Sequence, residues 1–357
     1  MNKKRLLVMA GAIFLALAVM ALPSMASCAP APPAEEEEEV EIYTWKSQGA
    51  YVWADPSQKS MPMWCARVAE KSGGRIIITP YAEAEVVPTS EILDALGKGV
   101  VELGQGQLSY YSGKYPVLDS VTGYPYTFVD TPECSGEDVY RKLFSSGLND
   151  IWEEALEPAN ATVLTHFSWG EYPGLYGKEP INSIEDFKGK RMRLNPPFDK
   201  LFAKVEAETL WIPGAEQYMA LKLGTIDIAS WDCTAYRTMQ WYEVAPYYYR
   251  PNLVDHSIGW LGINLELFNS LPDDLQEVLR EAGEWYSLWY LENATYVESQ
   301  WVTENQEELG YQVWTLDPSI VDELRAKGVE VLDEFAEQDD LCARAAEILK
   351  KEFMGAE

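Results

Sequence analysis

The sequence predicts a two-lobed α/β protein with a ligand cleft between the lobes and a helical C-terminal region. Short β-type runs alternate with amphipathic helical stretches, and this alternation occurs in two separate sets. A later apolar run at residues 256–264 has the pattern of a strand that returns to the first set. Of the 357 residues 47% are hydrophobic, which is enough for two domains with cores of their own.

The first set predicts a parallel β-α-β-α-β unit. Gly73 and Gly74 end its first helix, while Thr89 or Ser90 can cap the second helix and Gly99 can end it. Strands that alternate with helices in this order pair in parallel through right-handed crossovers. The expected strands are residues 40–45, 75–81 and 100–103, and the expected helices are residues 61–71 and 89–98.

The second set follows a helical stretch at residues 137–156 and predicts the other lobe. Because the chain crosses between the two sets more than once, strand ends from both lobes can enclose a small molecule. We assign residues 41–165 plus 252–285 to lobe I, and residues 166–251 plus 286–357 to lobe II and the C-terminal helices. The expected strands are residues 161–167, 190–194, 209–213 and 225–229, and the expected helices are residues 198–206, 215–223 and the region from 273 onward.

The N-terminus predicts export. Three cations at residues 3–5 precede an apolar run at residues 6–22, which indicates a signal peptide over residues 1–27. A retained membrane helix is the alternative, because the run is long for a signal and slightly short for a span. The segment MASC at residues 25–28 resembles the lipobox of bacterial lipoproteins, with Met25 in place of the usual Leu, and implies lipidation of Cys28. A plain secreted protein is the alternative there.

A Pro- and Glu-rich segment at residues 28–40 predicts a stiff tether between the membrane and the folded part. The formal charge of −29 excludes nucleic acid as a partner, because such a binder needs a basic face. The same charge repels anionic lipid, so the lipid anchor is the one membrane contact we expect. The expected location is extracytoplasmic, either periplasmic or at the cell surface.

Cysteine and histidine usage argues against a zinc ribbon, a thioredoxin-type redox centre and a His-rich zinc site in the folded part. The folded part has four cysteines, and no two of them form a C-x-x-C pair. They could form two disulfides, in any of three pairings, or no disulfide at all. These cysteines are Cys65, Cys134, Cys233 and Cys342. Two histidines are too few for a His-rich zinc site. The sequence has no G-x-S-x-G, H-E-x-x-H, P-loop or Rossmann glycine pattern, so we do not expect an enzyme.

Four segments in register resemble the extracytoplasmic solute-binding proteins of TRAP transporters, the tripartite ATP-independent periplasmic transporters. The resemblance implies a periplasmic-binding-protein-like fold that passes a solute to the permease subunits of an ion-gradient-driven transporter. Similar lobes also serve ATP-driven importers and sensors, which are the alternatives. The segments are SGGRI at 72–76, LGKGVVEL at 96–103, SIEDFKGKRMRL at 183–194 and ALKLGTID at 220–227.

Further stretches are similar to the branch of this family that binds 2-oxo acids and lactate. They are GQLSYYSG at 106–113, GTID at 224–227 with Trp231 after it, and VAPYYYRP at 244–251. The resemblance implies a small organic acid as the solute, for example a 2-oxo acid or a 2-hydroxy acid, while dicarboxylates stay open. Capture would proceed by lobe closure about hinges at residues 167–176 and 247–251, with Tyr247 to Tyr249 in the second crossover.

Arg193 matches the family's substrate-clamping arginine, and the physics suits that use. A guanidinium donates two parallel hydrogen bonds to a carboxylate and stays charged. Trp231 matches a tryptophan that faces the cleft in the similar branch. Tyr110, Tyr111 and Trp169 are further candidates for the pocket wall, since aromatic rings exclude water and their polar tips orient a bound acid.

The resemblance also implies a metal ion, but one of its ligands is missing here. The similar branch has Glu immediately before the tryptophan, and this sequence has Ser230. We expect Glu171 or Asp232 to supply the missing charge, so that Ca²⁺ or Na⁺ binds among oxygen ligands from Glu171, Trp231 and Asp232. A solvated Glu171 and no metal is the alternative. Solute identity and oligomeric state are left open, with a homodimer among the options.

Overall fold

The computed structural model divides the chain into residues 1–40 and one compact unit from residue 41 to residue 357. Among the residues that it describes, no helix is both long and apolar enough to span a bilayer. The described residues are 41–51, 53, 56–121, 124, 136–168, 174–232, 235–254 and 257–354. The predicted signal peptide, tether and Cys28 lie outside these residues, as do Cys134, Trp169, Glu171 and Cys233.

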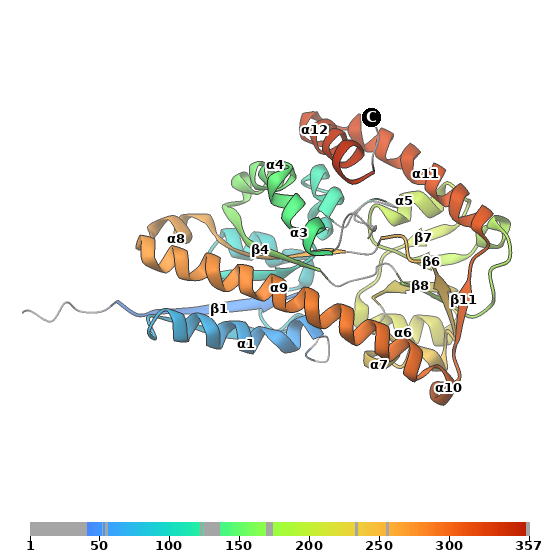
Figure 1. Ribbon diagram of the computed structural model, residues 1–357, viewed down its shortest axis with the longest axis horizontal. Helices are drawn as coiled ribbons and strands as arrows, with labels where there is room; N and C mark the ends of the chain where they lie inside the picture. The colour runs from blue at the N-terminus through green and yellow to red at the C-terminus, as the bar shows by residue number, and fades with distance from the viewer. Residues whose placement is uncertain are drawn as a thin grey trace, which may run out of the picture. The chain divides into compact units, whose positions relative to one another are not determined.

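A five-stranded sheet, in the order β2-β1-β3-β10-β4, forms the first half of the compact unit (Figure 1). The expected parallel unit is confirmed, because β1 pairs in parallel with both β2 and β3. The third strand begins three residues later than expected, since Gly99 turns the chain with a φ of +68°. The strands are β1 (Tyr43–Gly49), β2 (Ile76–Tyr81), β3 (Leu103–Gly106), β4 (Ala161–Ser168) and the antiparallel return strand β10 (Ile258–Asn264).

A six-stranded sheet, in the order β11-β9-β5-β8-β6-β7, forms the second half. Strand β6 pairs in parallel with β7 and β8, so the carboxyl ends of these three strands meet at one edge. Residues 247–249 lie in β9, because Tyr favours strands and Tyr248 stacks on Tyr176 of β5 at 4.9 Å. Their role in a hinge crossover stays a prediction. The strands are β5 (Gly174–Gly177), β6 (Arg191–Arg193), β7 (Glu208–Leu210), β8 (Ile228–Trp231), β9 (Tyr247–Arg250) and β11 (Gln312–Thr315).

Short helices connect the strands and cover the sheets. The stretch expected to be helical at residues 137–156 is two helices, because Gly147 adopts a φ of +83° between them. The helices of this group are α1 (Pro56–Lys71), α2 (Ile92–Gly97), α3 (Gly136–Ser145), α4 (Leu148–Leu156), α5 (Phe198–Ala203), α6 (Gly214–Leu223), α7 (Ala235–Thr238) and α8 (Leu265–Ser270). The 3-10 helices η2 (Leu108–Tyr111) and η3 (Pro116–Val121) follow β3.

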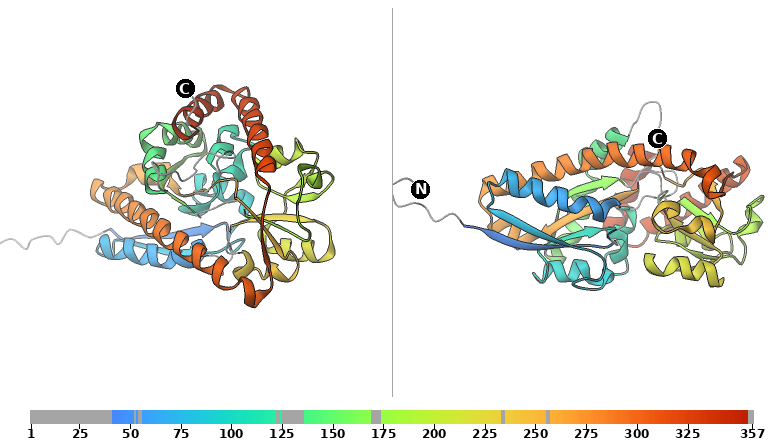
Figure 2. Two further views of the ribbon diagram at one scale, coloured as in Figure 1. Left: turned by 45° about the vertical axis from the view of Figure 1, so that its right-hand side comes forward. Right: turned by 90° about the horizontal axis from the view of Figure 1, so that it is seen from below.

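One long helix, α9 (Asp273–Glu304), runs beside both halves of the compact unit (Figure 1 and Figure 2). It packs on β4 and α1, and Gly283 permits the contact, because a Cβ there would meet the carbonyl oxygen of Leu164 at 2.8 Å. The lobe boundary expected at residues 285 and 286 lies inside this helix.

The C-terminal segment runs from the second half back to the first. After α10 (Gln306–Leu309) the chain adds β11 to the second sheet, then forms α11 (Pro318–Ala336) and α12 (Asp340–Ile348). Helix α11 contacts α5, whereas α12 contacts α4 and η3. A π-helical turn (Leu349–Phe353) follows. The C-terminal helices therefore connect elements of the two halves.

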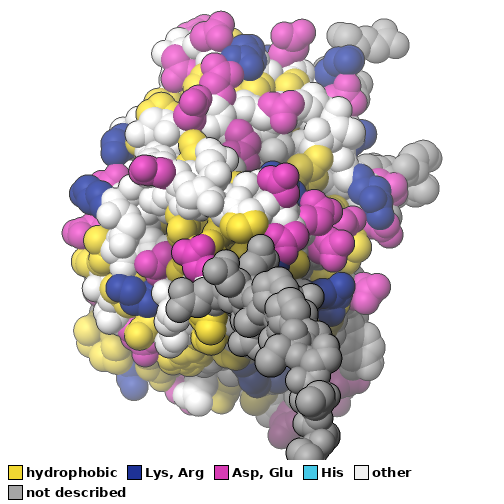
Figure 3. Space-filling model, turned by 90° about the vertical axis from the view of Figure 1, so that its left-hand side faces the viewer, with side chains coloured by type: hydrophobic (Ala, Val, Ile, Leu, Met, Phe, Trp, Pro, Cys, Tyr) yellow, Lys and Arg dark blue, Asp and Glu magenta, His cyan; other side chains and the backbone are white. Residues whose placement is uncertain are grey.

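Of the four cysteines that follow Cys28, Cys65 and Cys342 are described, and both are buried free thiols. Burial raises the pKa of Cys65 to about 12 and, together with a hydrogen bond to Asp339, raises the pKa of Cys342 to about 12. Thiols in such surroundings are inert structural residues. On the surface, acidic side chains are spread over the face shown in Figure 3 with basic side chains among them, as the net charge requires.

Candidate functional site

Arg193 lies at the carboxyl end of β6, at the edge where β6, β7 and β8 end together. Its position is supported by an ion pair between Arg191 on the same strand and Asp227, just before β8. Arg191 donates to both carboxylate oxygens of Asp227 at 2.8 and 3.0 Å. Partial burial of Asp227 raises its pKa, but the hydrogen bonds from Arg191 outweigh that effect, so the pKa of Asp227 lies below its usual value. Arg191 and Asp227 therefore link β6, which carries Arg193, to β8, which carries Trp231.

The guanidinium of Arg193 is almost completely buried, with 1% of the residue exposed. Its Nε donates to the backbone oxygen of Ile212 at 2.9 Å, and Nη1 is 3.4 Å from the backbone oxygen of Ser230. Its centre lies 5.6 Å from the ring centre of Trp231 and 5.9 Å from that of Trp211. Within the part of the chain that the structure describes, no acidic side chain pairs with Arg193.

A small pocket lies against Arg193 and is lined by residues from both halves of the compact unit. The first half contributes Tyr51, Glu83 and Tyr110, among others, from segments that follow β1, β2 and β3. Tyr51 meets the ring of Trp231 edge-on, with centroids 6.4 Å apart. The pocket has a volume of about 20 Å³, which is room for only a few atoms. Its contacts are therefore made by both halves at once.

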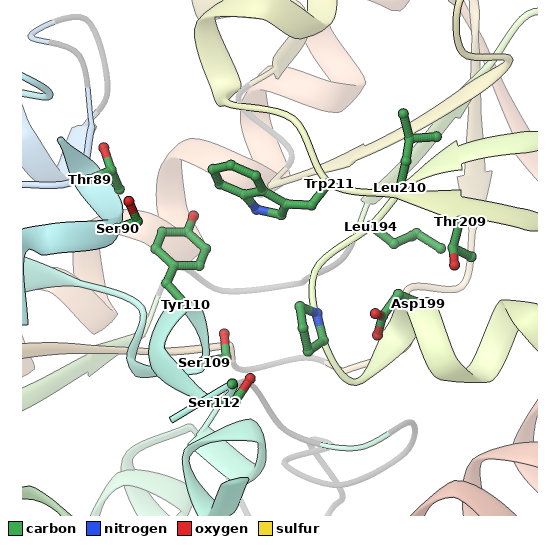
Figure 4. A pocket seen from close by; sticks show the side chains of 12 residues that line it. Thr89, Ser90, Ser109, Tyr110, Ser112, Leu194, Asp199, Thr209, Leu210 and Trp211 are labelled. Carbon is green, nitrogen blue, oxygen red and sulfur yellow. The ribbon is translucent and has the colours of Figure 1, made fainter. Parts of the chain in front are cut away.

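A second and larger cavity of about 510 Å³ adjoins the small pocket (Figure 4). The two share Thr89, Tyr110 and Trp211. Tyr110 and Trp211 face each other from opposite halves, with ring centroids 6.1 Å apart and planes at 70°. Burial raises the pKa of Asp199, a carboxyl in its wall. Its lining residues are Thr89, Ser90, Ser109, Tyr110, Ser112, Gly113, Leu194, Pro196, Asp199, Thr209, Leu210 and Trp211.

Hydrogen bonds connect the two halves beside these cavities. Asn195, two residues after Arg193, donates to the side-chain oxygen of Gln107 at 3.0 Å. Lys200 of α5 pairs with Asp119 of η3 at 2.5 Å. The two halves are therefore in direct polar contact beside the cavities.

The candidate residues from the sequence fall into three groups. Arg193, Trp231 and Tyr110 meet at the small pocket. Tyr111 points elsewhere: its side chain is buried and its hydroxyl donates to the backbone oxygen of Thr89 at 3.3 Å. Asp232 is buried, and its backbone oxygen accepts from the hydroxyl of Tyr176 at 2.6 Å. Trp169 and Glu171 lie outside the described residues.

The described residues contain no acidic, histidine or cysteine cluster of the kind that holds a metal ion. They contain no group of three or more His, Cys, Asp or Glu side chains placed to hold an ion. Ser230 cannot replace a carboxylate ligand, and its buried hydroxyl has no hydrogen-bond partner in the described ranges. Glu171 lies outside the described residues, so the predicted metal ligands Glu171, Trp231 and Asp232 stay a prediction.

Several pocket residues were not among the sequence candidates, notably Tyr51, Glu83, Thr89 and Trp211. Tyr51, Glu83 and Trp211 lie in irregular segments soon after a strand of their own half, and Thr89 begins a 3-10 helix (Thr89–Glu91) after β2. Because the carboxyl ends of parallel strands line the ligand crevice of open α/β sheets, the residues after each expected strand were the available signal. That rule indicates the segment that contains Tyr51, but Trp211 lies inside the strand expected at residues 209–213, which in the structure ends at Leu210. The rule also does not indicate which side chains face Arg193.

The fold and the site together define a solute-binding protein: two α/β halves meet at a pocket with a buried arginine that pairs with no acidic side chain of the described residues. A family model, described as bacterial extracellular solute-binding protein, family 7, matches residues 51–339. The chain belongs to this family, and the resemblance seen in the sequence is confirmed.

The curated relatives include a monocarboxylate 2-oxoacid-binding periplasmic protein of Nostoc sp., 30% identical over 247 residues. That match covers 66% of this chain and 62% of the relative, so it spans less than two thirds of the relative's length. A solute-binding protein of Chromohalobacter salexigens is 23% identical over 245 residues, which cover 68% of this chain and 70% of the relative.

Solved structures share the fold. A TRAP periplasmic solute-binding protein of Pseudoalteromonas atlantica, with bound sodium and pyruvate, has a TM-score of 0.82 at 23% identity. Another from Colwellia psychrerythraea, with bound calcium and pyruvate, has a TM-score of 0.82 at 22% identity. In both cases the match covers 88% of this chain and 95% of the other chain. The expected two-lobed binding-protein fold is confirmed.

Proposed function

We propose that this protein captures a small organic acid outside the cytoplasm through Arg193 and delivers it to an ion-gradient-driven permease. One observation carries the proposal: a buried guanidinium at the meeting point of two halves has no acidic partner within the described residues. An isolated buried charge is costly, so a ligand that brings a carboxylate stabilises the closed site. The indole N–H of Trp231, also buried and without a partner among the described residues, is a further donor for that ligand.

Capture proceeds by closure of the two halves on the solute. The contacts Asn195–Gln107, Lys200–Asp119 and Tyr110–Trp211 form only in the closed arrangement. A ligand that bridges the halves adds its own contacts to these and shifts the population toward the closed state by its differential affinity. The crossovers near residues 167–176 and 247–251 would act as hinges, with the two sheets as the cores of the lobes.

The class of solute follows from the site and from the relatives. The Nostoc relative is named for 2-oxo acids, and two structural neighbours contain pyruvate. Monocarboxylates with a 2-oxo or 2-hydroxy group are thus the first candidates, followed by dicarboxylates. The site has a binding role and no catalytic one, and a Ca²⁺ or Na⁺ ion held with Glu171 is part of the proposal.

The export and anchoring of the protein remain part of the proposal as well. Residues 1–27 would be removed as a signal peptide, Cys28 would be lipidated, and residues 28–40 would tether the domain to the membrane. The membrane subunits of the permease would then meet the loaded receptor close to the bilayer. A homodimer stays an option that the sequence left open.

A thermal-shift screen of the purified protein tests the function. The panel contains monocarboxylates, 2-oxo acids, 2-hydroxy acids, dicarboxylates and neutral sugars, each with and without Ca²⁺. A ligand at 100 times its dissociation constant adds about 2.7 kcal/mol to stability, which such a scan detects. We expect stabilisation by an acid and by no neutral sugar. Stabilisation by a neutral sugar alone would contradict the proposal.

A further inference from the structure

The larger cavity, of about 510 Å³, lies beside the small pocket, but neither Arg193 nor Trp231 lines it. Small-molecule sites usually have volumes of about 300–1,000 Å³. The small pocket, at about 20 Å³, has room for only a few atoms of a solute. A three-carbon acid with its carboxylate on Arg193 would therefore leave most of the larger cavity to water.

Two aromatic rings mark the passage from the small pocket to the larger cavity. Tyr110 and Trp211 line both spaces, one from each half of the compact unit, and their ring centroids are 6.1 Å apart (Figure 4). The guanidinium centre of Arg193 lies 5.9 Å from the ring centre of Trp211. A chain attached to a carboxylate on Arg193 would thus pass these rings and enter the larger cavity.

The walls of the larger cavity combine carbon surface with hydroxyl groups. Burial of a methylene group strengthens binding by about fourfold, so each carbon of a chain that fills this space adds affinity. Hydroxyl groups in the wall do not oppose a neutral chain, because they rotate to find other partners. The apolar and aromatic lining residues are Tyr110, Leu194, Pro196, Leu210 and Trp211, and those with an aliphatic hydroxyl are Thr89, Ser90, Ser109, Ser112 and Thr209.

The charge in this wall is negative. None of the twelve described lining residues is Lys, Arg or His, and one of them, Asp199, is acidic. One carboxylate oxygen of Asp199 accepts from the backbone N–H of Lys200 at 2.8 Å, and Asp199 forms no ion pair with a described residue. Burial and the charge of Asp119 raise the pKa of Asp199, whereas the hydrogen bond from Lys200 and the charge of Lys200 lower it. The ammonium of Lys200 pairs with Asp119, so these three groups together have a charge of −1.

A second carboxylate on the chain would be unfavourable in this cavity. It would lose water, meet no cation among the described lining residues and be repelled by Asp199. A neutral chain of the same length avoids these costs. Two acids with the same head group make the same contacts at Arg193, Glu83 and any cation held with Glu171, so those charges do not decide between the two chains.

We propose that the solute is a monocarboxylate with an uncharged, largely apolar chain longer than the methyl group of pyruvate, which lies in the 510 Å³ cavity beyond Tyr110 and Trp211. The inference rests on the proposed function at Arg193 and specifies the solute class of that site. It assigns Asp199 as the residue that disfavours dicarboxylates, which the contacts at Arg193 do not reject.

Isothermal titration calorimetry with acids that share one head group tests this assignment. Pyruvate, 2-oxohexanoate and 2-oxooctanoate form the length series. The charge pairs are 2-oxohexanoate with 2-oxohexanedioate and 2-oxooctanoate with 2-oxooctanedioate, which differ only in the terminal methyl or carboxylate. The protein is first freed of co-purified ligand, and each titration is made with Ca²⁺ and again in EDTA. The variants are Asp199→Asn, which keeps an acceptor for the N–H of Lys200, and the exposed control Asp322→Asn outside both pockets.

We expect at least one longer monocarboxylate to bind ten times or more tighter than pyruvate and ten times or more tighter than its dicarboxylate partner. This order should be the same with Ca²⁺ and in EDTA. Asp199→Asn should reduce the preference over the dicarboxylate threefold or more and leave the affinity for the monocarboxylate within twofold, while Asp322→Asn should change neither.

Three results overturn the inference but leave the proposed function: pyruvate binds as tightly as the longer acids, the dicarboxylates bind as tightly as their partners, or the preference persists in Asp199→Asn. An order that reverses in EDTA overturns the inference too, because a metal ion would then select the chain. If none of these acids binds, the proposed function itself is refuted.

Discussion

Lys200 and Asp119 form an ion pair across the two halves of the molecule, with Nζ 2.5 Å from Oδ2. The side chain of Asp119 is 2% exposed, whereas that of Lys200 is 41% exposed. The second oxygen of Asp119 has no hydrogen-bond partner within the described residues. The carboxylate is thus buried on η3 and depends on a cation that α5 supplies from the other half.

Removal of that cation should weaken closure. Lys200→Met leaves Asp119 buried without its counter-charge, which we expect to destabilise the ligand-bound form by about 1–3 kcal/mol. The measurement is the denaturant midpoint of the protein with and without saturating ligand. The double variant Lys200→Met with Asp119→Asn should recover part of the loss, because the isolated charge is then gone. Equal stability of the wild-type and Lys200→Met proteins would argue against the pair as a closing contact.

Arg193→Ala should reduce solute affinity by roughly 10–150-fold, which corresponds to about 1.5–3 kcal/mol for a charge-assisted hydrogen bond. Arg193→Lys should also lose affinity, because one ammonium cannot reproduce the two donors of a guanidinium. Calorimetry measures the affinity, and a melting curve without ligand measures any effect on folding. If the Arg193→Ala variant binds the solute with wild-type affinity, Arg193 does not bind the solute.

Gly214→Ala should disturb the pocket through Trp231. A Cβ at position 214 would lie 2.7 Å from Cη2 of the Trp231 ring, and a rigid indole cannot yield at that distance without a shift. We expect a loss of stability of about 1–3 kcal/mol, as for other overpacked sites, together with weaker solute binding. Gly113→Ala is the control for stability, because its added methyl group meets open space. A melting temperature equal to that of wild type in Gly214→Ala would contradict this account.

His166 should make the protein less stable in mild acid. Burial lowers the pKa of His166 to about 4, in spite of its contact with the backbone oxygen of Gly259. The unfolded chain takes up this proton near pH 6.5, so stability falls as the pH falls from about 6.5 to about 4. The full loss is about 3 kcal/mol. Urea unfolding across this range should show a steeper loss for wild type than for His166→Gln, and parallel curves would refute the assignment.

Metal analysis tests the predicted cation. If Glu171 replaces the carboxylate that Ser230 lacks, protein purified without chelator should contain about one Ca²⁺ per chain, or should be stabilised by Na⁺ relative to K⁺. Glu171→Ala should lose the ion, while the exposed Glu185→Ala should retain it. If neither the ion nor the stabilisation is found, the presence of Ser230 in place of the family's Glu has removed the metal site.

Some expected elements were displaced for reasons that lie outside their own sequence. Strand β11 was not expected, because its four residues gain strand structure only from parallel pairing with β9. The tyrosines of β9 were expected in a hinge crossover, and their pairing with β5 and β11 was not foreseen. Local patterns cannot show which distant segment will provide such a partner.

Local patterns in the sequence were enough to predict the α/β alternation, the parallel first unit and the family, and they gave Arg193 and Trp231 as candidate site residues, both of which line the small pocket. These features can be predicted from the sequence because they depend on local periodicity and on short motifs. Arg191 and Asp227 are two such motif residues, and they pair between neighbouring strands. Only the tertiary structure decided that Tyr51, Glu83 and Trp211 meet Arg193. Those side chains lie in irregular segments, and only the packing of two sheets against each other, built from strands distant in the chain, brings them to one pocket.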